Sequence, residues 1–453
     1  MKRTALTGVS LLAIMFTMAQ NLTKVKDAIN AKKYAEAKTQ LEEFINNPKY
    51  QKNTELFYLK GKLYGDIVAD PNAEKSYPDA FQLAMDNFKK TAEMDKSKFV
   101  MYTTLEGTQQ IFNLYAIPYN KGVKSLETKE YDKALTEFQQ ADMAGRFIFG
   151  QGLGLTALDT TLIFYTGFSA LLGGKEDLAA QYFTKLANIN VGEKGFEDVY
   201  KNLMIYHFNK NNLAEFEKVR QQGLKLYPKE EYFTYDEVVF INDIKDEADK
   251  LKRIEAKVAK DPKNMEAISI LTEILFDKLI NADSLYPKEE DYKAAESKVV
   301  GLYEQMAALS PEDGLIPFNT GLIYINKGFK INNNISDVND KIRKFNDAQK
   351  PDKAGKIPPP PKELTTLRED LRAKQQVAFD QGLPYLLKAQ PLIEKKSGAG
   401  RGELQNYKKL LDILIEIYSS KRQAAKLPAD KAKYEAEEAK WNKEYDRINN
   451  AGK

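Results

Sequence analysis

One glycine-rich stretch has the composition of a phosphate-binding loop. It reads GRFIFGQGLGL, from Gly145 to Leu155. A P-loop needs Lys followed by Ser or Thr after its glycines, because a charge and a hydroxyl must meet the phosphate and its magnesium ion, and neither residue is present. The looser dinucleotide-binding pattern, read from Gly152, follows no convincing strand. We therefore interpret the stretch as a turn between helical units, where glycine supplies permissive backbone geometry.

The single histidine, His207, is the other residue that could carry acid–base chemistry. It lies beside Tyr206 and Phe208 on an expected helix, with no nucleophile or metal-ligand partner that the sequence identifies. The chain has no cysteine, which excludes disulfides, thiol nucleophiles and Cys-based metal sites. The segment from Asp337 to Asp347 lacks the glycine and the spacing of an EF-hand loop. We therefore predict no catalytic residue, no cofactor and no metal site, and a protein that is not an enzyme.

The composition is that of a globular protein. Of the 453 residues, 43% are hydrophobic and 29% are charged, and the chain has 25 Tyr and 23 Phe. The net charge is +3, with Lys and Glu interspersed along the chain. Because no basic patch stands out, we expect no nucleic-acid partner.

Residues 1–19 have the pattern of a secretory signal peptide. Lys2 and Arg3 form the positive region, a mostly apolar run follows from Ala5 to Phe16, and cleavage is predicted before Gln20. A short membrane anchor or a buried first helix is the alternative, but the run is shorter than the roughly 20 residues that span a bilayer. Without a cysteine for a lipid anchor, the mature chain is expected to be periplasmic or secreted, with no membrane span.

The stretch from Tyr119 to Met143 sets a pattern that recurs along the chain. Counted from Gly122, the apolar and small residues at nine, twelve, sixteen and nineteen positions further on are Tyr131, Ala134, Phe138 and Ala141. These spacings predict two helices, each with one buried face, joined by a short turn. The pattern resembles the tetratricopeptide repeat (TPR), whose period is 34 residues.

Further units can be aligned on the same spacing. They are read from Val25, from Gly61 with a second helix about eleven residues late, from Gly167, and from Met204. The predicted organisation is a signal peptide (1–19), N-terminal TPR-like repeats (20–230), degenerate helical repeats (231–328), a polar, proline-rich insertion (329–378), and a C-terminal helical repeat with a cap (379–453). Within the insertion, Pro358 to Pro361 favour an extended, stiff surface loop.

The last expected helix carries an interrupted apolar stripe. The stripe consists of Tyr434, Trp441, Tyr445 and Ile448, and Glu438 interrupts it. A solenoid needs such an end, because its final repeat has no neighbour to cover the outer face. We predict that this helix is the cap.

The resemblance implies an all-α, TPR-like helix-turn-helix solenoid, or superhelix, whose first helices line a concave groove. In that family the residues three before and one after the Gly122 position face the groove. Carried over to this chain, the predicted partner-binding residues are Tyr58, Tyr119, Phe164, Phe168, Lys201 and Phe318. Aromatic rings give large contact areas and stack on peptides or sugars. The alternative is that these rings pack against the adjacent repeat as core.

The resemblance also implies a function. TPR proteins are generally scaffolds, so we expect a non-enzymatic scaffold exported to the cell envelope, which binds a protein partner or an envelope component through its groove. The alternative is a soluble glycan-binding protein that resembles the SusD-like binders, which are also built on TPR helices. Those proteins are normally anchored through a cysteine, which this chain lacks, and one tryptophan is few for stacking on sugars.

Overall fold

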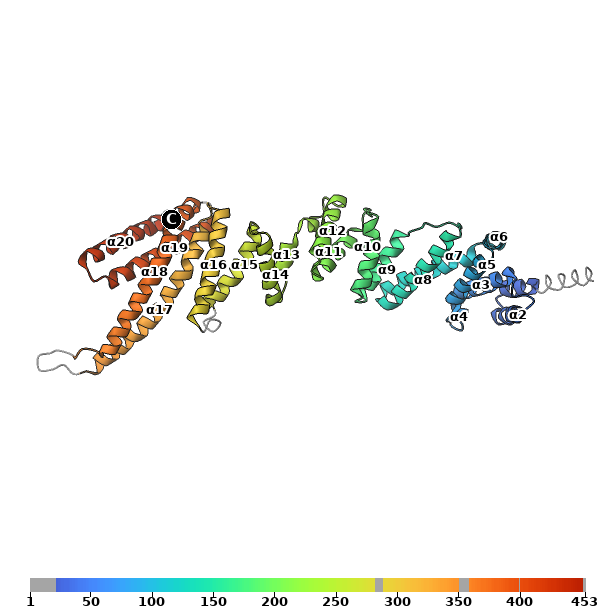
Figure 1. The fold of residues 1–453 in the computed structure, drawn as a ribbon, viewed down its shortest axis with the longest axis horizontal. Coiled ribbons are helices and arrows are strands. Elements are labelled where there is room, and N and C mark those ends of the chain that lie inside the picture. The colour runs from blue at the N-terminus through green and yellow to red at the C-terminus, as the bar shows by residue number, and fades with distance from the viewer. Residues whose placement is uncertain (1–21, 282–287, 350–357, 399, 451–453) are drawn as a thin grey trace, which may run out of the picture. The chain divides into compact units, whose positions relative to one another are not determined.

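The computed structural model describes residues 22–281, 288–349, 358–398 and 400–450, and all regular structure in these ranges is helical. The predicted signal peptide and its cleavage point lie outside the described residues. The chain divides into two compact units, one reaching Glu237 and the other beginning at Val238, and Figure 1 labels their helices. The all-α class that the repeat spacing predicts is confirmed.

The first unit is a series of helix pairs that begins with a helix over residues 22–30. Its further elements are α2 (Tyr34–Asn46), α3 (Thr54–Val68), α4 (Pro71–Glu74), α5 (Ala80–Met94), α6 (Lys96–Glu106), α7 (Gln109–Glu127), α8 (Tyr131–Gly150), α9 (Thr160–Leu172), α10 (Glu176–Asn188), α11 (Glu197–Asn209), α12 (Leu213–Leu226) and the 3₁₀ turn η1 (Glu231–Thr234). The short helix α4 lies in the turn-rich insertion that delays the second helix of the Gly61 unit.

The second unit follows the same helix-after-helix order with longer elements. They are α13 (Glu237–Asn242), α14 (Glu247–Lys260), α15 (Met265–Asn281), α16 (Glu289–Leu309), α17 (Leu315–Ala348), α18 (Lys362–Lys396), α19 (Arg401–Ala424) and α20 (Pro428–Asn450). The antiparallel pair α17–α18 extends past its neighbours, as Figure 1 shows.

Within a pair, a glycine of the first helix accommodates a phenylalanine ring of the second. A Cβ atom built on Gly122 would lie 2.7 Å from the Phe138 ring, and one built on Gly167 would lie 2.8 Å from the ring of Phe183. A Cβ atom built on Gly61 would lie 2.6 Å from the ring of Phe88, in spite of the insertion in that unit. Since real Cβ atoms do not approach carbon this closely, each of these positions requires glycine for the two helices to pack as they do.

The turns between paired helices share one backbone conformation. The residue seven positions after the glycine position has a positive φ in four units, namely Lys32 (59°), Lys129 (63°), Gly174 (73°) and Asn211 (55°). In each turn the next residue donates its N–H to a carbonyl five residues earlier, as Glu130 does to Ser125 at 2.8 Å. This is the six-residue hydrogen bond of a Schellman helix end. The register read from Val25, Gly122, Gly167 and Met204 is therefore confirmed.

The segment predicted as a polar insertion, 329–378, is mostly helix. Residues 329–348 continue α17 and residues 362–378 begin α18. Ile335, Val338 and Ile342 are buried at helical spacing, and this sparse stripe is masked in the sequence by the surrounding Asn, Asp and Lys. Of the four prolines, Pro361 is extended, with φ −50° and ψ 132°, and directly precedes α18. Proline is tolerated at that place because the first amides of a helix need no helical acceptor.

The final helix closes the second unit as predicted. Trp441 and Ile448 are buried, and Tyr434 and Tyr445 pack against the same core. Glu438, which interrupts the stripe, accepts a hydrogen bond from Arg422 of α19 at 2.7 Å. The interruption is therefore an ion pair between the last two helices.

We expect Gly167→Ala to lower the free energy of unfolding by about 1–3 kcal/mol, because the added methyl group overlaps the Phe183 ring. Gly301→Ala on α16 is the matched control. Its Cβ has nothing within 4 Å, so the same change should stabilise by roughly 0.5–1 kcal/mol through helix propensity alone. Urea denaturation followed by circular dichroism measures both effects. Stabilisation of both variants would contradict the close packing of ring on glycine.

Candidate functional site

Two of the six predicted groove residues are core residues. Tyr58 is 2% exposed and Phe318 is 3% exposed. Tyr58 lies on α3, which contacts α2, α5, α6 and α7, and its ring packs against those of Phe88, Phe99 and Tyr102. These neighbours cover the face that the repeat pattern assigns to the groove. The burial of Tyr58 and Phe318 therefore favours the alternative of core packing over the predicted binding role.

The other predicted rings form part of a continuous, partly exposed aromatic row. We call it the aromatic row, and it consists of Tyr115, Tyr119, Phe164, Tyr165, Phe168 and Phe196. Tyr119 stacks on Tyr115 at 6.0 Å between ring centroids and meets Tyr165 of the next pair at 6.4 Å. Phe164 stacks on Phe168 at 5.8 Å and meets Phe196 at 5.4 Å. The row thus runs from α7 across α9 to the start of α11.

Polar contacts fix the helices that carry the aromatic row. The Tyr115 hydroxyl donates to Asp159 at 2.5 Å, and the same carboxylate caps α9 by accepting from the Leu162 amide at 2.9 Å. Burial, together with this hydrogen bond to a carboxylate, raises the pKa of Tyr115 well above its usual range. The phenol therefore stays protonated and keeps its donor role, so that α7 and α9 are held in register.

Lys201 lies on α11 beyond the end of the aromatic row. Its Nζ lies 3.0 Å from Glu230 and 3.8 Å from Asp198, and it sits 5.8 Å from the centroid of the Tyr232 ring. The side chain is 25% exposed. Its charge is therefore already matched by two carboxylates, and it is placed to support the α11 surface rather than to offer an unmatched cation.

A partly buried ion-pair network lies at the start of the first unit. Lys62 is 5% exposed, and its Nζ donates to Glu106 at 2.9 Å. Lys26 reaches the same carboxylate at 2.9 Å and Glu55 at 3.0 Å. Burial alone would raise the pKa of Glu106, but the hydrogen bonds and charges of the two lysines outweigh it and lower the pKa. The network joins the first helix of the unit to α3 and α6.

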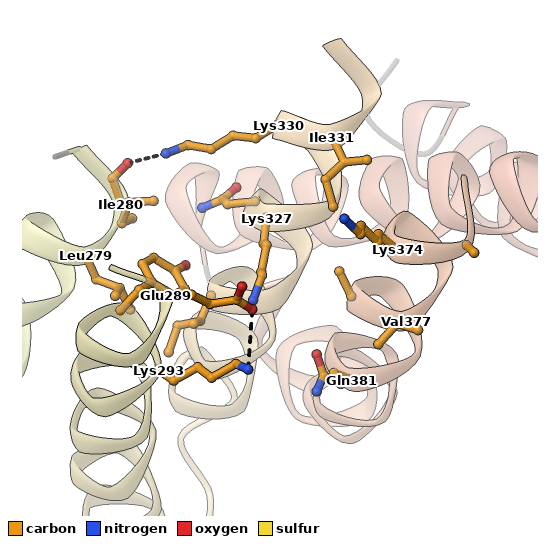
Figure 2. Close-up of a pocket in the computed structure, with 15 residues that line it drawn as sticks. Leu279, Ile280, Glu289, Lys293, Lys327, Lys330, Ile331, Lys374, Val377 and Gln381 are labelled. Carbon is orange, nitrogen blue, oxygen red and sulfur yellow. Dashed lines mark hydrogen bonds and ion pairs between the residues drawn. The ribbon is translucent and has the colours of Figure 1, made fainter. Parts of the chain in front are cut away.

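A cavity of about 850 Å³ in the second unit was not anticipated from the sequence. It lies where α15 ends and α16 begins, against the middle of α17 and α18, as Figure 2 shows. Its lining combines aliphatic side chains with four lysines and one glutamate: Leu279, Ile280, Glu289, Tyr292, Lys293, Ile323, Asn326, Lys327, Lys330, Ile331, Ala373, Lys374, Val377, Ala378 and Gln381. The alternation of Lys with Ile or Val at helical spacing in 327–331 and 374–377 is the signal that could have indicated it.

The glycine-rich stretch and His207, the candidates for chemistry in the sequence, form no group of catalytic or ligating side chains among the described residues. Gly152 and Gly154 have positive φ values of 74° and 108° in the turn that follows α8, which confirms the interpretation as a turn. His207 is partly buried beside the Tyr206 ring, and burial lowers its pKa. Among the described residues no group of His, Cys, Asp and Glu could hold a metal ion. Across the same residues, no helix has the length and hydropathy that a membrane span needs.

We expect Glu106→Gln to lower the free energy of unfolding by about 1–3 kcal/mol at neutral pH, because buried Lys62 loses its charged partner. The pKa of Glu106 is lowered from 4.5, so its contribution is complete above that value and is lost as the pH falls through the folded-state pKa. The variant should therefore lose less stability than the wild type on acidification below about pH 4.5. Denaturant melts across pH measure this.

Glu215→Gln is the control for this change. Glu215 pairs with Lys218 at 3.0 Å, but both side chains are largely solvated. Exposed pairs contribute little, so this variant should stay within about 0.5 kcal/mol of the wild type. Equal losses in the two variants would mean that burial of Lys62 has no special cost.

Comparison with known proteins gives structural similarity alone. No protein-family model and no curated protein matches the chain. The TPR2AB domain of yeast Sti1 in a pHSP90 complex aligns over 65% of this chain and 96% of its own, with 15% identity and a TM-score of 0.24. The P58(IPK) TPR domain aligns over 96% and 99%, with 10% identity and a TM-score of 0.19. A circular tandem repeat protein aligns over 95% of each chain, with 11% identity and a TM-score of 0.23.

TM-scores this low mean that the chains do not superpose as wholes, so the fold assignment rests on the helix pairs described above. Four turns share one left-handed position, and paired helices pack a phenylalanine ring onto a glycine. The chain is an all-α protein of TPR-like helix pairs.

Proposed function

We propose that the protein is a non-enzymatic scaffold that binds an extended polypeptide partner along the aromatic row of its first unit. The observation that carries the proposal is the continuity of six partly exposed rings over three successive helix pairs. Such rings contribute large apolar contact areas and are typical anchors of protein interfaces.

The rings are also held in place before any partner arrives. Each is stacked on or edged against another ring of the row, as the parallel pair Phe164 and Phe168 illustrates with an interplanar angle of 10°. A surface whose side chains are already ordered loses little conformational freedom on binding. Ile205, 41% exposed, adds apolar area on α11, the helix that follows Phe196. The partner we infer is therefore a chain with apolar side chains spaced to meet successive helices.

A soluble glycan is the alternative ligand, since sugars also stack on aromatic rings. The peptide is preferred because the rings of the row pack at mixed angles, with interplanar angles from 10° to 70°, and so do not form the single flat platform that a sugar face stacks on. Export to the cell envelope is part of the same proposal and rests on the leader pattern of residues 1–19.

A photo-crosslinking phenylalanine analogue placed at Phe168 should capture a polypeptide partner in cells that produce the protein. The same analogue at Phe149, which is 46% exposed on the second helix α8, is the matched control and should capture far less. Once the partner is purified, Phe168→Ala should weaken binding about tenfold or more, because aromatic anchors dominate interface energy. Phe149→Ala should bind as the wild type does.

Both alanine variants must first retain wild-type helicity by circular dichroism. Equal capture from the two positions, or full partner binding by folded Phe168→Ala, would contradict the proposed site. A third outcome would favour the glycan as the ligand. In that case the wild type would bind a glycan array, Phe168→Ala would not, and no polypeptide would be captured.

Mass spectrometry of the protein isolated from the envelope fraction should find Gln20 as the first residue. The reason is that the small residues before it fit the cleavage site of a signal peptidase. Replacing Ala19 with a bulky residue such as Tyr should block cleavage and leave a longer chain. A mature protein that retains Met1 and remains in the cytosol would contradict export.

A further inference from the structure

The cavity in the second unit has the features of a small-molecule site. The aromatic row of the first unit lacks these features. Its volume of about 850 Å³ lies within the range of small-molecule sites, roughly 300–1,000 Å³. Leu279 and Ile323 are buried in its wall, and Val377 is 59% exposed. An apolar side chain left this exposed within a concave site offers contact area to a ligand.

The charge around the cavity is strongly one-sided. Among the described residues, four lysines line it against Glu289, and Glu296 lies near Lys327, whereas the whole chain is nearly balanced, with 68 basic and 65 acidic residues. Figure 2 shows these lysines around the cavity on α16, α17 and α18, with Lys330 directed to Ile280 and Lys293 to Glu289. Such an arrangement of cations around apolar walls complements a ligand with an anionic head.

The four lysines differ in whether their ammonium groups already have a partner within the protein. Lys293 lies 3.3 Å from Glu289. Lys327 reaches Glu296 at only 3.9 Å and lies over the Tyr292 ring. Lys330 donates to the Ile280 carbonyl at 3.1 Å. Lys374 is exposed and makes no hydrogen bond or ion pair within the described part of the chain, so its ammonium group is the one placed to meet a ligand directly.

We propose that this cavity binds an anionic amphiphile, meaning a single hydrocarbon chain with a carboxylate or phosphate head. The hydrocarbon chain lies against Ile280 and Ile331, which are partly exposed, and against Val377, and the head meets Lys374 and Lys327. The proposal is independent of the function proposed for the first unit, and either can fail without the other.

The walls favour an acyl chain over a buried peptide. They are helices whose backbone groups are bonded within the helix, and the neutral amide side chains that line the cavity are Asn326 and Gln381. A peptide segment in the cavity would leave many backbone N–H and C=O groups without partners, which is costly. An acyl chain brings no such groups, and lysine ammonium groups are pure donors that suit the acceptor oxygens of a carboxylate or phosphate head.

The test uses the full mature chain and cis-parinaric acid, a fatty acid whose fluorescence rises in an apolar site. The acid should bind saturably, and its methyl ester should bind about tenfold more weakly, because the ester lacks the charge that the lysines recognise. Palmitate and a single-chain lysophosphatidic acid should both displace it, and their ranking identifies the preferred head. Inorganic phosphate and acetate should not displace it, since they lack the chain.

Two variants and two matched controls, all on α18, test whether the ligand binds in the cavity. Lys374→Met should weaken binding about tenfold and Val377→Asp at least as much, while Lys388→Met and Leu387→Asp should have no effect. All four side chains are exposed, and neither control residue lines the cavity, so folding should be retained in each variant. Wild-type binding by Lys374→Met and Val377→Asp, or equal losses in the controls, would overturn the proposal. Tighter binding of an acidic apolar peptide than of any amphiphile would overturn it in favour of a peptide.

Discussion

The close approach of a phenylalanine ring to a glycine is the contact on which the rest of the first unit depends. Without a Cβ at Gly122 or Gly167, the ring of the partner helix can enter the space that a side chain would fill. This brings two helices together along one face and leaves the other face of the first helix to form contacts with the next pair. The left-handed turn residue then sets where the second helix begins. The geometry of each pair thus depends on a small residue at the point where its two helices approach most closely.

The same constraint explains why apolar rings remain at the surface. Phe138 and Phe183 occupy the interior of their pairs, and Tyr119 and Phe164 on the first helices pack on these rings and on rings of the neighbouring pairs. This packing covers part of each ring and leaves the remainder in solvent. On α3, additional helices cover that face, so Tyr58 is buried. The exposure of a ring at this repeat position therefore depends on how many helices surround it.

Much of the fold could be predicted from the sequence, because spacing between small and aromatic residues is a local property. The register from Gly122 and Gly167 is correct, as is the cap that contains Trp441. The helices within 329–378 were missed, since three buried residues spaced along a polar segment give a weak pattern. The candidate sites were harder to predict from the sequence than the fold. Burial of Tyr58 depends on α6, which lies outside the repeat pattern, and the cavity depends on how residues from four successive helices, α15 to α18, come together in three dimensions.

Contacts in the first unit run chiefly between successive helices, from α7 to α8, α8 to α9, and onward to α12. In such an arrangement the stability is a sum of pair terms and nearest-neighbour interface terms. Cooperativity is then a property of each interface rather than of the whole chain. Thermal opening can begin at one interface and stop at the next, so the enthalpy obtained from the steepness of melting should fall below the calorimetric enthalpy. The first unit should therefore open and close one interface at a time rather than as a whole.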